Sequence, residues 1–141
     1  MTIVLKGTKD LKMKLNAGNI RVAQAVTSAT LDIVNEVAQK SLSYVPFDTG
    51  DLSASQHITL PKWSGQQCIA KVSYGGTAAP YALIQHENKK FFHPAKDNGG
   101  TGPVGAPEGR GYKYLEYPAK QAAKKYPKDI VKAANQKLRA L

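Results

Sequence analysis

Cysteine is almost absent from this sequence, because Cys68 is the only one in 141 residues. A single cysteine cannot form an internal disulfide, and one inside an apolar run is typical of a small buried side chain. No stretch of about 18 apolar residues exists, so no transmembrane helix is expected. The apolar stretch near residue 1 is too short for a signal peptide. We therefore expect a protein that is made and used in a cytoplasm and has no membrane partner.

Acidic residues are scarce as well: ten Asp and Glu against twenty Lys and Arg give a formal net charge of +10. This charge favours an anionic partner such as nucleic acid or an acidic protein surface. The bases are not gathered into one binding motif. They are densest over 111–141, where eight basic residues minus two acidic ones leave +6. A solvated basic helix face explains this segment as simply as a contact with DNA or an acidic neighbour.

Catalytic motifs are missing too. The sequence has no Gly-x-x-x-x-Gly-Lys phosphate loop and no Cys-His nucleophile pair within one motif. The Asp48-Thr49-Gly50 tripeptide resembles the catalytic turn of aspartic proteases, but it follows a long predicted helix instead of lying in a β-rich frame. His86, Glu87 and His93 lack His-Glu-x-x-His spacing, so a satisfied polar network or a solvated loop is expected there and not a metal site. We expect that the protein is not an enzyme and that it binds no metal and no cofactor.

The spacing of apolar residues predicts one α+β domain over 1–141. Its main parts are a long N-terminal helix over 20–43, packed on a small antiparallel sheet of about four strands, and a C-terminal helix from Tyr117. Pro127 is expected to kink or restart that last helix. The strands are expected at 2–5, 55–60, 66–74 and 112–116, with short helices at 9–16 and 80–87.

The long helix carries two apolar stripes, so it should be covered on two sides. The sheet is expected to cover one side, and the C-terminal helix or a neighbouring subunit the other. The first stripe holds Val22, Val26, Ala29, Ile33 and Val37, and the second holds Leu31, Ala38 and Leu42. The predicted core residues are Val26, Ile33, Val37, Leu52, Ile58, Val72, Leu83 and Ile130.

Two connections stand out. Asp48, Thr49 and Gly50 are expected to shape the turn that launches the first hairpin, with Gly50 at positive φ. The Gly- and Pro-rich loop over 88–111 is too long for an ordinary connection, so a neighbouring chain is expected to hold it. The candidate subunit-interface residues are Leu31, Leu42, Phe91, Phe92 and Tyr112.

Three motifs in this order resemble one family. They are Pro-Phe-Asp-Thr-Gly-Asp-Leu-Ser-Ala-Ser over 46–55, Tyr-Ala-Leu-Ile-Gln-His-Glu over 81–87 and Lys-Tyr-Leu-Glu-Tyr-Pro-Ala over 113–119. Together they resemble the tail-completion and minor capsid proteins of long-tailed bacteriophages. The resemblance covers about 20–141, and the order of all three motifs in so short a chain makes it specific.

The resemblance implies a long helix on a small antiparallel sheet, and assembly as a homo-oligomeric ring of about six or twelve copies in the virion. Such proteins terminate the tail tube or join it to the head connector, and these are the implied partners. The chain departs from the common pattern after Glu87, where many relatives have Gly-Thr. The resemblance therefore leaves open whether the chain is a terminator, a connector or another neck component.

A basic nucleic-acid-binding protein is the alternative. Lys89, Lys90, Phe91 and Phe92 place bases beside aromatic rings that are able to stack on nucleotides, although the rings serve equally well as anchors in a protein interface. In a ring, non-specific contact with channel DNA would instead use a basic lining. The candidates for that lining are Lys89, Lys90, Lys124 and Lys125.

Overall fold

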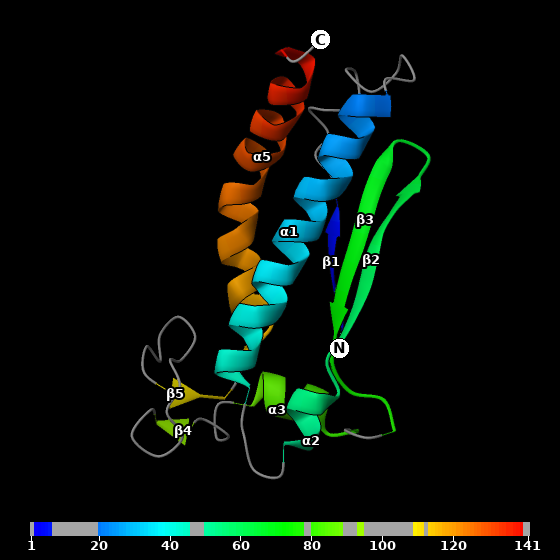
Figure 1. Ribbon diagram of the computed structural model, residues 1–141. Helices are drawn as coiled ribbons and strands as arrows, with labels where there is room; N and C mark the ends of the chain where they lie inside the picture. Colours follow the sequence, from blue (N-terminus) through cyan, green and yellow to red (C-terminus); the bar gives the residue numbers. More distant parts are fainter. Residues whose placement is uncertain are drawn as a thin grey trace.

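The computed structural model describes residues 2–6, 20–45, 50–77, 80–88, 93–94, 109–111 and 113–139. Over these residues the chain is an α+β protein with a long N-terminal helix, an antiparallel sheet and a C-terminal helix, as predicted (Figure 1). No helix in this part of the chain is long and apolar enough to cross a membrane. The predicted features that lie outside the described residues are the helix over 9–16, Asp48, Thr49, Lys89, Lys90, Phe91, Phe92 and Tyr112.

The sheet has three antiparallel strands in the order β1-β3-β2. Their bounds are Thr2–Lys6 for β1, His57–Ser64 for β2 and Gln67–Ser73 for β3. Cys68, Ala70 and Val72 alternate along the central strand and are all buried, so one face of it is apolar, as its period of two predicts. A separate pair of two-residue strands is formed by β4 (His93–Pro94) and β5 (Gly109–Arg110).

The prediction of about four strands in this sheet is therefore corrected to three within the described residues, because the strand expected at 112–116 is not formed. Residues 113–115 form a turn, and Glu116 begins the last helix. Tyr114 and Leu115 have no measurable exposure, so they anchor the turn in the core. A pair of consecutive buried residues does not fit a strand with one apolar face, in which burial alternates.

The last helix, α5, spans Glu116–Arg139 and contains Pro127. Of the two predicted effects of this proline, a kink or a restart, the restart does not occur, because the helix continues through Pro127. Pro127 has no N–H group for the carbonyl oxygen of Ala123, one turn earlier. Since Ala123 is exposed, water is able to satisfy that oxygen, and the cost of the proline is reduced.

The long helix α1, Ile20–Tyr44, packs against α5 on one side and against β2 and β3 on another (Figure 1). Every residue of its first apolar stripe is buried, as predicted. In the second stripe Ala38 is buried, Leu31 is half-buried, and Leu42 is 36% exposed. The C-terminal helix thus provides a second cover for α1.

Six of the eight predicted core residues are buried: Val26, Ile33, Val37, Leu52, Val72 and Ile130. Ile58 is only partly buried against this core. Leu83 is a wrong prediction, because its side chain is 55% exposed. Helix α3, Ala82–Glu87, instead buries Ala82 and His86, which lie four residues apart on one helical face, and this turns Leu83 outward.

The turn at Gly50 does not launch the first hairpin directly. A short helix, α2, spans Asp51–Ala54, so the strand that was expected from Ser55 begins at His57. Gly50 itself has φ 91°, the left-handed conformation that was predicted for it. The strands predicted over 55–60 and 66–74 leave the five residues 61–65 between them, but the hairpin is closed by the two residues 65–66.

Replacing Gly50 by valine should lower the free energy of unfolding by about 1–3 kcal/mol, because a β-branched residue is strained at positive φ. Asparagine tolerates this region better, so Gly50→Asn should lose less than half as much. Denaturant unfolding of the parent and both variants measures the difference. Equal stability of Gly50→Val and the parent would rule out the left-handed turn.

Candidate functional site

The second and third motifs meet at one end of the fold, away from the C-terminus (Figure 1). The tyrosine of the third motif, Tyr114, donates a 2.9 Å hydrogen bond to the carbonyl oxygen of Ala82 in the second. The backbone N–H of Lys113 donates to the carbonyl oxygen of His86 at 2.6 Å. The start of α5 is therefore joined to α3 through residues of both motifs.

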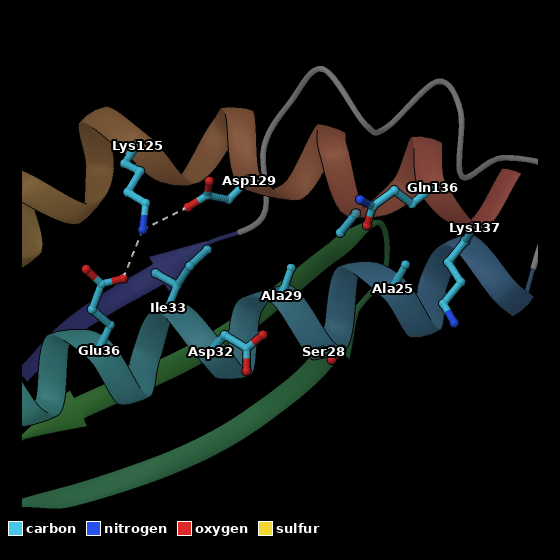
Figure 2. A pocket seen from close by; sticks show the side chains of 11 residues that line it. Ala25, Ser28, Ala29, Asp32, Ile33, Glu36, Lys125, Asp129, Gln136 and Lys137 are labelled. Atoms are coloured by element: carbon cyan, nitrogen blue, oxygen red, sulfur yellow. Dashed lines mark hydrogen bonds and ion pairs between the residues drawn. The ribbon is translucent and has the colours of Figure 1, made fainter. Parts of the chain in front are cut away.

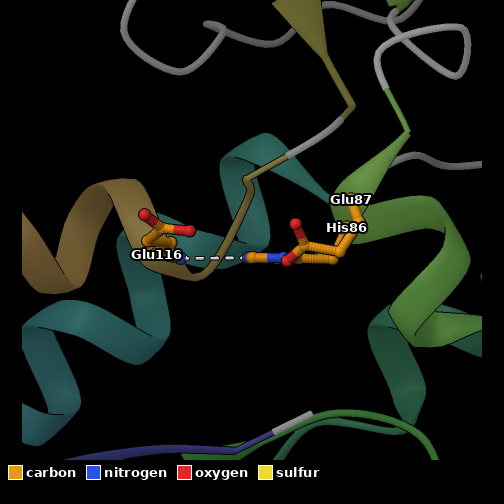
Figure 3. A group of neighbouring side chains, drawn as sticks. All are labelled: His86, Glu87 and Glu116. Atoms are coloured by element: carbon orange, nitrogen blue, oxygen red, sulfur yellow. Dashed lines mark hydrogen bonds and ion pairs between the residues drawn. The ribbon is translucent and has the colours of Figure 1, made fainter.

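His86 lies at the centre of this contact, with 1% of its surface exposed (Figure 3). Its Nε2 atom accepts a 3.2 Å hydrogen bond from the backbone N–H of Glu116, one of the free donors at the start of α5. Because Nε2 accepts, the ring proton is on Nδ1, which lies 2.7 Å from Oε1 of Glu87 and donates to it. Burial lowers the pKa of His86, and the imidazole is held neutral.

Two tyrosine rings enclose this histidine region. The ring of Tyr114 meets His86 edge-on at a centroid distance of 4.9 Å and meets Tyr74 at 5.1 Å. Burial raises the pKa of Tyr114 above its ordinary value and that of Tyr74 to about 12. The Tyr74 hydroxyl also contacts Ser41 and Gln56, so the same packing reaches the end of α1.

A lysine supplies the positive charge of the group. The Lys113 ammonium lies 2.7 Å from Oε2 of Glu87 and 2.6 Å from Oε2 of Glu116, and Lys120 also pairs with Glu116. Hydrogen bonds from Lys113 and Lys120 hold the pKa of Glu116 at about 2, and bonds from Lys113 and His86 lower that of Glu87. Lys113 has φ 61°, a strained conformation for a residue with a side chain.

These five residues, His86, Glu87, Lys113, Tyr114 and Glu116, are called the His86 cluster below. Ligand atoms of His86, Glu87 and Glu116 lie within 4.8 Å of one another, close enough to share a metal ion. Both imidazole nitrogens are hydrogen-bonded, however, and Lys113 bridges the carboxylates. A metal would have to displace these partners, so for His86, Glu87 and Glu116 the geometry favours the satisfied polar network, one of the two interpretations that the sequence leaves open.

From the sequence, His93 is the third residue considered beside His86 and Glu87, and Glu116 is not singled out. The side chain of His93 lies outside the described part, and the third member is Glu116, which comes from the start of α5. Only the tertiary contact between α3 and α5 brings it there. The one available signal was Lys113, which is three residues before Glu116 at a spacing typical of helical ion pairs.

A groove of about 470 Å³ runs between α1 and α5 (Figure 2). Small side chains on both helices, among them Ala25, Ala29 and Ala133, leave this space open. At one end Lys125 lies 3.4 Å from Glu36 and 3.4 Å from Asp129. The groove presents small apolar groups, the ion-paired carboxylates of Glu36 and Asp129, and the polar side chains of Ser28, Asp32, Gln136 and Lys137.

The candidates for contact with DNA therefore differ in their surroundings. Lys125 shares its charge with two carboxylates, whereas Lys124 is exposed and no ion pair to it is found among the described residues. Lys89 and Lys90 lie outside the described residues, as do the interface candidates Phe91, Phe92 and Tyr112. Of the two remaining interface candidates, Leu42 is the more exposed, and its role in assembly stays a prediction, as does that of Leu31.

Comparison with known proteins gives no family assignment: no family model, no curated protein and no solved structure matches this chain. The geometry of its own residues therefore carries the functional argument.

Lowering the pH from 7 through about 6.5 should reduce the free energy of unfolding, because unfolded chains take up a proton on the imidazole near that pH. Burial lowers the pKa of His86 in the folded chain, so the unfolded state binds more protons in this window. A second loss follows below about 4.5, where the carboxylates of Glu87 and Glu116 are protonated first in unfolded chains.

Denaturant unfolding between pH 7.5 and 5 measures the first window. In the His86→Gln variant the free energy of unfolding should no longer fall between pH 7.5 and 5. At pH 7.5 it should be about 1–3 kcal/mol lower than in the parent, because hydrogen bonds are lost. His57→Gln removes an exposed histidine from β2 and is the matched control. If the His86 variant keeps the parent's pH dependence between 6.5 and 5, the buried neutral imidazole is not its source.

Proposed function

We propose that this chain is a non-enzymatic structural protein of a bacteriophage virion that acts at the joint between head and tail. In this role it assembles as a homo-oligomeric ring around the DNA channel and joins the tail tube to the head connector, as a neck, tail-completion or terminator subunit. The proposal is built on the three motifs, on the helix-and-sheet fold that the resemblance implies, and on the surfaces that the fold leaves exposed.

The observation that carries the proposal is that residues of all three motifs are buried in the core or join one element to another. In the second and third motifs, Ala82, His86, Tyr114 and Leu115 are buried, and His86 accepts a hydrogen bond from the backbone N–H of Glu116. In the first motif, Leu52 is buried in the same core cluster. Residues that carry a family signature but fill a core and join elements support a structural role, since a catalytic role would need them open to substrate.

The exposed apolar side chains supply candidates for contacts between subunits. Tyr81, Leu83 and Ile84 lie together at α3 and are 38%, 55% and 58% exposed; they are called the α3 patch below. Leu60, which is 62% exposed, lies on β2 at an edge of the sheet. A ring with head-to-tail contacts needs two different patches on each copy, and these two surfaces meet that requirement.

A nucleic-acid-binding protein without a ring is the second candidate, and the exposed lysines of α5 favour it. The aromatic part of that alternative rests on Phe91 and Phe92, which lie outside the described residues. The two candidates are separated by whether the purified chain forms a ring without nucleic acid.

The purified chain is expected to form a closed oligomer, with a mass that is a fixed multiple of 15.2 kDa in native mass spectrometry or light scattering. Leu83→Ser with Ile84→Ser should shift this equilibrium toward monomer by at least about tenfold, because each removes buried apolar area from an interface. Folding should be unchanged, since both side chains are more than half exposed in the single chain.

Ile20→Ser is the matched control, because Ile20 is 71% exposed at the other end of α1. A parent chain that stays monomeric with and without head or tail partners would end the proposal. An unchanged ring in the double variant would exclude the α3 patch as an interface.

Shortening the loop by deleting 97–106 should leave the monomer folded and weaken the ring, because an arm that reaches the next copy adds contact area. Circular dichroism and unfolding check the fold, and the mass of the assembly checks the ring. A chain with the same ten positions replaced by Gly and Ser separates length from sequence. Normal assembly of the shortened chain would count against the loop's role.

A further inference from the structure

The side of α5 that faces away from α1 carries a row of basic residues. Lys124, Lys128, Lys132 and Arg139 are all exposed, and at 100° per residue they fall within about 80° of one another around the helix. We call these four residues the basic face. It is about 22 Å long at a rise of 1.5 Å per residue. The buried residues of α5, among them Ile130 and Ala134, lie on the opposite side.

The basic face is not used for ion pairing within the described part of the chain. The acidic residues of α5 are engaged elsewhere: Glu116 with Lys113 and Lys120, and Asp129 with Lys125. Like charges four residues apart, as in Lys124, Lys128 and Lys132, destabilise a helix. The row therefore costs the helix stability, and that cost is offset when an anion binds.

The surroundings of the basic face favour nucleic acid over a protein. Among the residues of α5 whose side chains the structure describes, none is an exposed large hydrophobic, whereas a protein interface has an apolar centre. The neighbouring exposed side chains are amides, Gln121 and Gln136. A shallow depression along the face is lined by polar and apolar residues: Lys128, Lys132, Asn135, Gln136 and Arg139, with the partly buried Pro127 and Val131. A row of cations with amides between them suits a phosphate backbone, which presents negative charge continuously.

Duplex DNA fits this face better than single strands do. Binding of single strands uses exposed aromatic rings on which bases stack. The two aromatic residues of α5, Tyr117 and Tyr126, are half-buried, and the Tyr117 ring packs 5.4 Å from that of Tyr44. A straight row of charges without a stacking platform contacts the backbone of a duplex and reads no bases.

We propose that the basic face binds the phosphate backbone of duplex DNA without sequence preference. Lys128, Lys132 and Arg139 join Lys124 in this surface, while Lys125 faces the carboxylates of the groove and is not part of it. The identification of this duplex with the DNA in the channel of a ring rests on the proposed function. The binding itself requires only the exposed side of one helix.

The test is fluorescence anisotropy of a random-sequence duplex of about 20 base pairs, titrated with the full chain between 20 and 200 mM salt. Lys128→Gln with Lys132→Gln removes two phosphate contacts. The slope of log K against log salt should become less steep by about 1.8, and affinity at low salt should fall by at least about tenfold. Lys62→Gln with Lys71→Gln is the matched control, because both lysines are exposed on the sheet and either double variant lowers the net charge from +10 to +8.

An equal loss in both double variants would overturn the proposal, because net charge alone would then explain binding. Tighter binding to a single strand of the same length, or equal competition by polyglutamate of matched charge, would overturn it as well. The mass of the assembly is measured on the same samples. If a monomer binds duplex DNA through these lysines, the ring proposal fails and the DNA-binding proposal stands. If the chain forms a ring but the Lys128 and Lys132 substitutions do not change DNA binding, the DNA-binding proposal fails and the ring proposal stands.

Discussion

The burial of α1 on two sides is the constraint on which the rest of the fold depends. Val34, Val37 and Ala38 lie at different angles around this helix, yet each is at most 2% exposed. One face of a small sheet cannot cover so wide an apolar arc. A second element therefore has to lie along α1, and α5 does so with the small residues Ala119, Ala122 and Ala134. Small side chains let two long helices approach closely, and the same choice leaves the groove between them.

Placing α5 beside α1 creates a second requirement at the end where α5 begins. The first backbone N–H groups of a helix have no partner within it, and here one of them lies against buried residues. The neutral imidazole of His86 accepts from the N–H of Glu116, and Glu87 fixes the tautomer that makes this acceptor available. Lys113 keeps a left-handed backbone conformation because its N–H and its ammonium group both bond to the α3 region. Helix capping thus explains the arrangement of the His86 cluster.

The sequence predicted those parts of the fold in which one element's periodicity decides its structure. The 3.6-residue spacing of α1 and the alternation of β3 each identified the buried side correctly, down to Ile33 and Val72. Prediction failed where a partner far along the chain decides. Leu83 was assigned to the core because it is apolar, but α3 is oriented by the burial of His86, and that depends on α5. Glu116 was missed for the same reason, since no local pattern links it to α3.

Charge and apolar surface are divided between separate parts of this molecule, and this division bears on the proposed ring. Each copy carries +10, so copies brought together repel one another, and the repulsion must be offset by apolar contacts or by a polyanion. The α3 patch lies at the end of the fold away from the C-terminus, whereas the basic face runs toward the C-terminus along α5 (Figure 1). One copy is therefore able to contact a neighbour and a duplex at the same time. Because DNA bound along the basic faces would neutralise the charge that opposes association, ring closure and DNA binding would stabilise each other.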